Sequence, residues 1–229
     1  FNNPQAAELT YFGRHSLQHR GQESAGICVS DGEKFHTHRG AGLVTEAFGQ
    51  NQHLQLNGHI GIGHVRYTTA GDSGLLNAQP LVFRYSGGQV AVAHNGNLVN
   101  AKRLRTDLEK QGSIFQTNSD TEVIPHLIAR AGPPIRKAVQ EAFRRIEGAY
   151  ALIFMTETQL VAAQDPRGFH PLSLGKLDDG WLVASETCAH DVCGAEFVRE
   201  IEPGEMLMID RDGLHSSSFV DPDDRFVCS

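Results

Sequence analysis

The sequence is poor in cysteine and has no patterned metal ligands. Its four cysteines, Cys28, Cys188, Cys193 and Cys228, match no disulfide framework, which is typical of a reducing compartment and predicts a cytoplasmic protein. The 12 histidines are scattered and never form a His-Glu-x-x-His motif. We therefore expect no zinc site built by this chain alone.

Long apolar runs and long basic runs are also absent. No apolar stretch approaches the roughly 18 residues that a membrane-spanning helix requires. The first residues lack the basic and apolar regions of a signal peptide. A net charge of −7 without a basic cluster argues against a nucleic-acid surface. We therefore expect neither a membrane nor a nucleic acid as a partner.

What the sequence does contain is ordinary for a globular protein. Its 229 residues are 40% hydrophobic and 21% charged, enough for one large domain or two small ones with a substantial core. Apolar periodicity and turn residues predict a helix that starts at Asn3-Pro4 and ends near 18–21, and a loop over 68–77. Further helices are expected over 43–48, 100–111, 119–132, 134–147 and 186–192, and strands over 24–30, 34–38, 59–66, 81–84, 89–93, 149–155, 160–163, 172–174, 181–185, 198–201 and 205–209. Clustered strands and clustered helices favour α+β layers over alternating βαβ units.

One segment, Ala-Val-Ala-His-Asn-Gly-Asn over residues 91–97, combines a buried strand with a polar end. We expect the strand to stop after Ala93 and to expose the polar residues. Asn95 carries a side-chain N–H, and the missing side chain of Gly96 lets a ligand approach its backbone N–H. Two adjacent donors form a plausible oxyanion hole for acyl transfer. The alternative is a tight turn, because Asn-Gly is a frequent turn dipeptide.

Four polar clusters stand at the ends of apolar segments, at 18–23, 64–69, 94–97 and 118–120. Together they suggest a cleft lined by hydrogen-bond donors, one arginine and one acid. Arg66 could hold a carboxylate through two parallel bonds, and Asp120 could hold an ammonium group, as the two ends of an amino acid require. The alternatives are a structural salt bridge for Arg66 and a helix cap for Asp120.

Seven motifs make the chain resemble a known family over nearly its whole length: LQHRGQESAGI, GIGHVRYTTAG, AHNGNLVNA, SDTEVI, DPRGFHPLSLG, ASETCA and EPGEML. They resemble the class II glutamine amidotransferase domain, and within it the amidophosphoribosyltransferase family of purine synthesis. The Arg20-Gly21-Gln22-Glu23 stretch separates the chain from glucosamine-6-phosphate synthases, where Arg-Gly-Tyr-Asp would be expected. The resemblance implies an N-terminal-nucleophile hydrolase fold, a four-layer αββα sandwich of two antiparallel sheets.

The resemblance also implies roles for particular residues. Arg66 would bind the α-carboxylate of glutamine and Asp120 its α-ammonium group, while Tyr67 and Thr69 would lie along the substrate. In the same way, Asn95 and the Gly96 N–H would form the oxyanion hole, and Arg20 would support the region of the nucleophile. The implied activity is release of ammonia from glutamine.

The nucleophile of this family is an N-terminal cysteine whose own α-amine acts as the base. This sequence begins with Phe1, which matches a family position roughly six residues after that cysteine. We expect an opening strand with the cysteine to precede Phe1. The alternative is a catalytically silent domain that binds glutamine or glutamate as a regulatory module.

The far end resembles the junction to a second domain. The whole of 1–229 would be the amidotransferase domain, with 225–229 leading to a phosphoribosyltransferase domain that binds phosphoribosyl pyrophosphate and Mg²⁺. In one branch of the family a cysteine in this junction helps to hold a 4Fe–4S cluster, and Cys228 matches it. The resemblance also leads us to expect a homo-oligomer.

Overall fold

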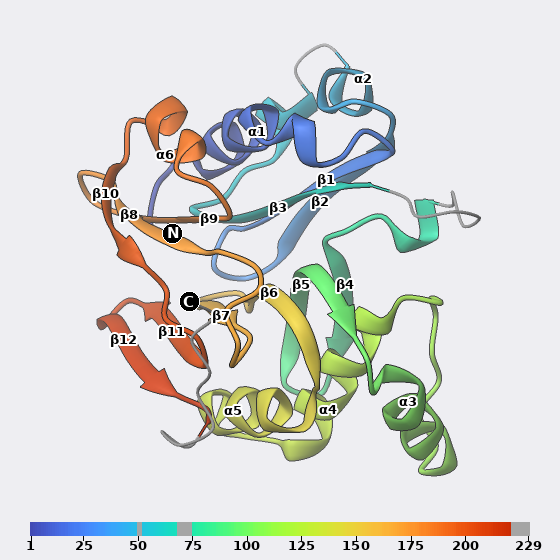
Figure 1. Ribbon diagram of the computed structural model, residues 1–229. Helices are drawn as coiled ribbons and strands as arrows, with labels where there is room; N and C mark the ends of the chain where they lie inside the picture. The colour runs from blue at the N-terminus through green and yellow to red at the C-terminus, as the bar shows by residue number, and fades with distance from the viewer. Residues whose placement is uncertain (50–51, 68–74, 221–229) are drawn as a thin grey trace.

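The computed structural model describes residues 1–49, 52–67 and 75–220. Its elements form four layers (Figure 1): helices, a layer of two small sheets, a six-stranded sheet, and a second layer of helices. This arrangement confirms the α+β sandwich expected from the resemblance. Within the described ranges, no helix has the length and apolar character needed to cross a membrane.

The larger sheet has the strand order β12-β11-β7-β6-β5-β4, and every neighbouring pair in it is antiparallel. Its long central strand, β5, pairs with β6 along eight residue positions from Ala91 to Leu98. The strands are β4 (Leu81–Tyr85), β5 (Gly88–Leu98), β6 (Gly148–Met155), β7 (Leu160–Gln164), β11 (Glu205–Asp210) and β12 (Gly213–Ser218).

The second β layer consists of two three-stranded antiparallel sheets, with orders β2-β1-β3 and β10-β8-β9. Strands β3 and β9 are edge strands, and they lie side by side in the layer (Figure 1). The strands are β1 (Ser24–Ser30), β2 (Phe35–Ala41), β3 (Ile60–Arg66), β8 (Ser173–Lys176), β9 (Trp181–Ala184) and β10 (Glu196–Glu200).

The helices cover the two outer faces of this β sandwich (Figure 1). One group covers the small sheets, and the other covers the six-stranded sheet. The first group is α1 (Ala6–Ser16), α2 (Val44–Phe48) and α6 (Cys188–Cys193), and the second is α3 (Ala101–Lys110), α4 (Val123–Ala131) and α5 (Ile135–Arg145). Short 3₁₀ turns are η1 (Gln18–Arg20), η2 (Gln52–Gln55), η3 (Leu75–Asn77) and η4 (Asp120–Glu122).

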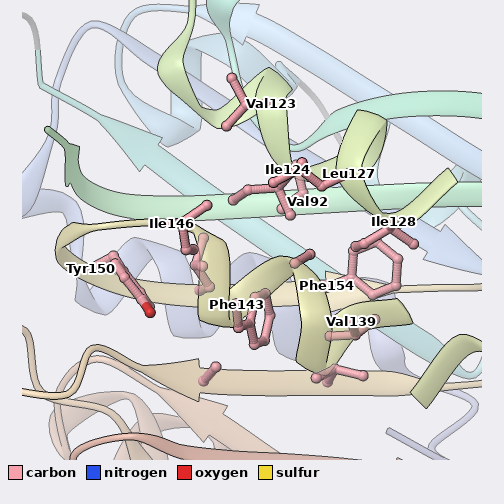
Figure 2. Packing of buried hydrophobic residues seen from close by; sticks show 14 of the residues in the cluster. Val92, Val123, Ile124, Leu127, Ile128, Val139, Phe143, Ile146, Tyr150 and Phe154 are labelled. Atoms are coloured by element: carbon pink, nitrogen blue, oxygen red, sulfur yellow. The ribbon is translucent and has the colours of Figure 1, made fainter. Parts of the chain in front are cut away.

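The largest core cluster fills the space between the six-stranded sheet and helices α3–α5. Figure 2 shows Val92, Tyr150 and Phe154 of the sheet facing the apolar sides of α4 and α5. Each fully buried side chain of this kind contributes about 1.5–3 kcal/mol to folding relative to an exposed one. The packing of this cluster holds β5 and β6 in place where the polar residues 94–97 lie.

Glycines allow helix α1 to pack closely on β3. A Cβ on Gly61 would lie 2.7 Å from Thr10 Oγ1, and one on Gly63 would lie 2.4 Å from Arg14 Cδ. Glycine inside a strand often marks such a close backbone approach, and these two glycines do so here. The approach also buries Arg14, which donates from Nη1 to the Gly26 carbonyl oxygen at 3.1 Å.

Two expected helix starts differ from the structure. Helix α1 begins at Ala6, not at Asn3-Pro4, because the Asn3 side chain closes a preceding turn by accepting the Gln5 N–H at 2.8 Å. The helix expected from residue 119 starts as the 3₁₀ turn η4, and α4 follows from Val123. Ser119 Oγ accepts the Thr121 N–H at 3.3 Å, but the carboxylate of Glu122 instead accepts the backbone N–H groups of residues 116 and 117, each at 2.7 Å.

Candidate active site

The polar segment of residues 94–97 does not end its strand. Strand β5 runs on to Leu98, with Asn95 opposite Ala151 and Gly96 opposite Tyr150 in β6. Both the expected stop after Ala93 and the alternative Asn-Gly turn are therefore wrong. Pairing with the neighbouring strand outweighs the local turn preference of the dipeptide.

Backbone groups along this part of β5 alternate in direction, as in any antiparallel pair. The backbone of Tyr150 bonds to Asp165 on the side away from β5, so Gly96 and Tyr150 do not exchange hydrogen bonds. The N–H groups at positions 94, 96 and 98 then point toward the other edge of β5. There His94 N–H donates to Gln79 Oε1 at 2.6 Å, and Leu98 N–H donates to Asp120 Oδ2 at 2.8 Å.

The Gly96 N–H lies between these two occupied donors, has no hydrogen-bond acceptor among the described residues, and belongs to an exposed residue. Glycine is required at this position for two reasons. Its φ of 145° is unfavourable for residues with a side chain, and an added Cβ would lie 2.0 Å from the Ala149 carbonyl oxygen. The structure thus supports a backbone donor at the position where the sequence predicts one.

The Asn95 side chain lies on the face of β5 that points toward the other sheet. Ala91 and Ala93, which share that face, pack in the cluster between the sheets. There Asn95 lines a cavity of about 470 Å³. Besides Asn95, the walls include Arg20, Arg66, Tyr67, Asn77, Gln79, His94, Gly96, Asn97, Asn118, Ser119, Asp120 and Ser185.

The cavity therefore brings together the predicted site residues that the structure describes. Tyr67 stands at its rim with 73% of its surface exposed. Thr69 lies outside the described residues, as does Cys228 with the junction at 225–229.

Arg66 ends β3 at the cavity wall. Its Nε lies 3.9 Å from Glu23 Oε2, a distance beyond hydrogen-bond length, so this ion pair is loose. Gly21 brings the neighbouring chain against Arg66, because a Cβ there would lie 2.6 Å from the Arg66 carbonyl carbon. A partly buried guanidinium whose ion pair among the described residues is loose is suited to hold a carboxylate ligand.

Asp120 opens η4 and lines the same cavity. Its Oδ2 accepts the Leu98 N–H, so the carboxylate is fixed to the same strand that carries the oxyanion donors. The nearest cationic candidate among the described residues is His94, whose Nδ1 lies 3.7 Å from Oδ1. Burial lowers the pKa of His94, and the field of Asp120 only partly opposes this, so the ring is neutral. Asp120 therefore presents an uncompensated negative charge to the cavity.

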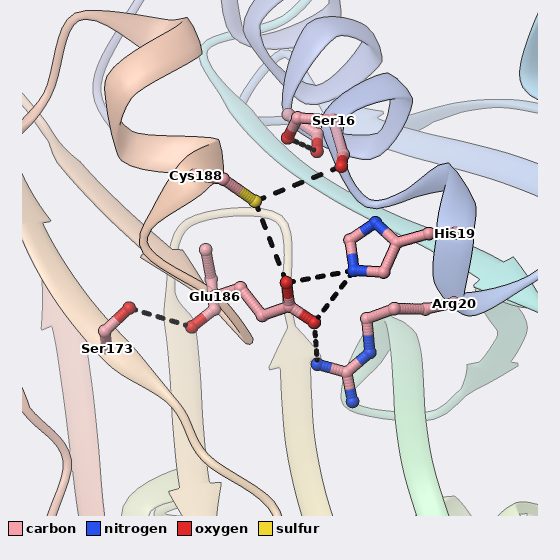
Figure 3. Close-up of polar contacts among 8 residues, drawn as sticks. Ser16, His19, Arg20, Ser173, Glu186 and Cys188 are labelled. Atoms are coloured by element: carbon pink, nitrogen blue, oxygen red, sulfur yellow. Dashed lines mark hydrogen bonds and ion pairs between the residues drawn. The ribbon is translucent and has the colours of Figure 1, made fainter.

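Arg20 is held by a small polar cluster (Figure 3). Its Nη1 donates to Glu186 Oε1 at 3.0 Å, and the same carboxylate contacts His19 Nε2 at 3.0 Å and lies 3.8 Å from Cys188 Sγ. Burial alone would raise the pKa of Glu186, but hydrogen bonds from His19 and the charge of Arg20 outweigh it and lower the pKa. Glu186 thus stays ionised and orients Arg20 toward the cavity.

A second, smaller cavity of about 130 Å³ lies along the unpaired edges of β3 and β9 and is lined by residues of both. Arg14, Gly63 and Ser185 line this slot and the larger cavity alike, so the two are contiguous. Phe1 lies in the slot and pairs with Trp181 through two backbone hydrogen bonds of 2.8 and 3.1 Å.

Sequence reasoning assigned no role to Gln79, His94, Thr121 or Glu186. His94 stood in a polar cluster and Glu186 in the ASETCA motif, which are the only signals for them. Thr121 stood in the SDTEVI motif, but its partner His94 lies 27 positions away in the chain. Gln79 carries no signal, because its partner lies 15 positions away.

No set of metal ligands occurs in the part of the chain that the structure describes. It contains no group of three or more His, Cys, Asp or Glu side chains placed to hold an ion. Burial raises the pKa of the Cys28 thiol to about 12 and that of Cys193 to about 11, which disfavours the thiolates that ligation requires.

Comparison with known proteins gives consistent matches. A family model described as "Glutamine amidotransferase domain" matches residues 64–190, more than half of the chain. Amidophosphoribosyltransferase of Bacillus subtilis (strain 168) is 51% identical over 231 residues, covering 100% of this chain and 48% of that protein.

Solved structures give the same result. The structure titled as glutamine phosphoribosylpyrophosphate amidotransferase from B. subtilis, complexed with ADP and GMP, matches with a TM-score of 0.91 and 50% identity, over 96% of this chain and 48% of that one. A structure titled as the allosteric regulatory enzyme of purine biosynthesis matches with a TM-score of 0.95 and 51% identity, over 100% of this chain and 50% of that one.

The sandwich fold, the paired donors and the family match define the class: the chain belongs to the glutamine amidotransferase domain family. Within that class, its curated relatives are amidophosphoribosyltransferases, and the chain spans about half of their length.

Proposed function

We propose that this chain is the glutaminase part of an amidophosphoribosyltransferase, and that it releases ammonia from glutamine. The observation that carries the proposal is the single cavity in which Arg66, Asp120 and the Asn95–Gly96 donors meet. An arginine and an aspartate in one cavity suit the two charged ends of an amino acid. The donors on β5 suit the oxyanion that forms at the side-chain amide.

The chemistry follows from these positions. A thiolate attacks the amide carbon of glutamine, and the carbonyl oxygen gains a negative charge that Asn95 Nδ2–H and Gly96 N–H stabilise. The α-amine of the cysteine, having taken the thiol proton, returns it to the amide nitrogen as the tetrahedral intermediate collapses, so that ammonia leaves and a thioester remains. Water then hydrolyses the thioester to glutamate and restores the thiol. Arg66 and Asp120 hold charges that stay constant throughout, so they serve recognition and alignment.

The thiol is assigned to an N-terminal cysteine on a strand preceding Phe1. The slot between β3 and β9 supports this assignment, because edge strands of two sheets line it and Phe1 already pairs with Trp181 at the start of β9. Continued antiparallel pairing would carry the chain along β9 toward Ser185, where the slot meets the cavity. The rival proposal, a silent glutamine-binding module, requires that no such cysteine exists.

We expect the natural protein to begin with a cysteine roughly six residues before Phe1, and that cysteine to react with glutamine analogues. A diazoketone analogue of glutamine should alkylate its sulfur with loss of dinitrogen and abolish glutaminase activity at one equivalent. Intact mass and peptide mapping locate the adduct. A mature protein that starts at Phe1 and still hydrolyses glutamine would contradict this mechanism.

The remaining half of the longer protein would use the ammonia. In this proposal it binds phosphoribosyl pyrophosphate with Mg²⁺, and ammonia displaces pyrophosphate to give phosphoribosylamine at the start of purine synthesis. We further propose a homo-oligomeric, cytoplasmic enzyme. The free thiols of Cys28, Cys188 and Cys193 support a reducing compartment.

Cys228 is proposed as one ligand of a 4Fe–4S cluster in the full-length protein. The three described cysteines do not fit such a cluster, because Cys28 and Cys193 are buried and no ligand group forms around them. The other ligands would therefore come from beyond this chain.

Anaerobically purified full-length protein should contain about four iron atoms and four sulfides per chain, with a brown absorbance band. Cys228→Ser should lower the iron content, whereas Cys28→Ser should leave it unchanged. Iron-free wild-type protein, or equal iron in both variants, would return Cys228 to the status of an ordinary cysteine.

A further inference from the structure

Hydrogen bonds among Asp120, Thr121 and His94 form a bridge across the part of β5 that carries the oxyanion donors Asn95 and Gly96. His94 Nδ1 lies 3.0 Å from Thr121 Oγ1, and Thr121 Oγ1–H donates to Asp120 Oδ1 at 3.4 Å. The other carboxylate oxygen accepts the Leu98 N–H at 2.8 Å. The bridge therefore leaves β5 just before Asn95 and returns to it just after Asn97.

The direction of the protons follows from the chemistry of each group. A carboxylate only accepts, so the single hydroxyl proton of Thr121 is committed to Asp120. The hydroxyl oxygen then accepts from His94 Nδ1–H, which fixes the tautomer of this neutral ring. Both partners are shielded from water, since His94 is 4% exposed and Thr121 is 0% exposed. Hydrogen bonds in such surroundings are strong and poorly replaced by solvent.

We propose that the bridge of Asp120, Thr121 and His94 couples recognition of the substrate's α-ammonium group to the geometry of the oxyanion hole. This inference rests on the proposed glutaminase function. An ammonium group at Asp120 neutralises a carboxylate that has no cationic partner among the described residues. The Asp120 carboxylate is then held in one position, and so are its contacts with Thr121 and with the Leu98 N–H. In this proposal Thr121 and His94 are positioning residues, because they act on the substrate through Asp120 and β5.

The bridge differs from the other contacts that hold β5 in place. Ladder bonds to β6 and the two-way pairing of the Gln79 amide with His94, at 2.6 and 3.2 Å, hold the strand with or without substrate. Among these described supports, the bridge contains the carboxylate that is proposed to bind the substrate's ammonium group. It follows that the α-ammonium group of glutamine should influence kcat as well as KM.

The test compares two substrates in the full-length enzyme: glutamine, and 4-carbamoylbutanoate, which is glutamine without its α-amino group. In the wild type, loss of the ammonium should lower kcat about tenfold, in addition to raising KM. Thr121→Val removes the hydroxyl at nearly constant volume. In this variant, kcat with glutamine should fall toward the desamino value, so that the two kcat values differ by less than about twofold.

Conservative partners show whether the hydrogen bonds matter. Thr121→Ser should keep the wild-type ratio of kcat values, and so should the exposed control Thr106→Val on α3. Should Thr121→Val fail to fold, a second pair decides. His94→Gln loses the donor at the Nδ1 position, so its kcat values for glutamine and 4-carbamoylbutanoate should become nearly equal. His94→Asn keeps a donor there and should retain the wild-type ratio of the two kcat values.

A bridge with a purely structural role would lower kcat for both substrates by the same factor in Thr121→Val, and that result would overturn the proposal. Nearly equal wild-type kcat values for glutamine and 4-carbamoylbutanoate would also overturn the proposal. Failure of the underlying function looks different, because wild-type protein would then hydrolyse neither substrate.

Discussion

Asn95→Ala should lower kcat for glutamine hydrolysis by about 10²–10³-fold in the complete protein, with KM little changed. The Asn95 amide faces the cavity beside the Gly96 N–H, and no hydrogen bond to another described side chain occupies it. It meets a full negative charge only in the tetrahedral intermediate. Its loss therefore raises the barrier by about 2.7–4 kcal/mol without weakening substrate binding.

Two comparisons make this result interpretable. Asn95→Asp preserves the shape of the side chain but removes the N–H donor, so it should be at least as slow as the alanine variant. Synthesis with external ammonia bypasses this cavity and should stay normal in both variants. Near-normal kcat with glutamine in Asn95→Ala would show that the oxyanion is stabilised elsewhere.

The sequence was most informative where burial alone decides the structure. Strand β1 spans Ser24–Ser30 as expected, because an uninterrupted apolar or small segment between turn residues has one good solution. Strand β12 was missed for the opposite reason. Its sequence, Gly213–Ser218, is polar and lies at the sheet edge, where pairing with β11 supplies the stability that side-chain burial does not.

Local signals misled where tertiary contacts take over. Asn95-Gly96 has strong turn chemistry, yet pairing with β6 on one edge, and Gln79 and Asp120 on the other, keep it extended. Arg66 and Asp120, which stand out in the sequence as an arginine and an aspartate next to strand ends, line one cavity in the structure. Their supports, such as Thr121 and Glu186, could not be found, because only the fold brings them to their partners.

Arg66→Ala should raise KM for glutamine by at least about 30-fold, because a charged, hydrogen-bonded pair with the α-carboxylate is lost. Arg66→Lys should recover only part of this, since an ammonium group cannot form the two parallel bonds of a guanidinium. Initial rates over a wide range of glutamine concentration, with external ammonia as the control reaction, measure both effects. An unchanged KM in Arg66→Ala would mean that Arg66 serves only its loose ion pair with Glu23.

Two substitutions at Asp120 should separate its charge from its contact with β5. Asp120→Asn loses the charge but keeps an oxygen that can accept the Leu98 N–H, so β5 keeps its support while the ammonium loses its partner. Its KM should rise by at least about 30-fold. Asp120→Ala also frees the Leu98 N–H, and should lower kcat about tenfold further, because the oxyanion donors are then less well placed. Equal kcat values for the two variants would show that the contact with Leu98 does not help to position Asn95 and Gly96.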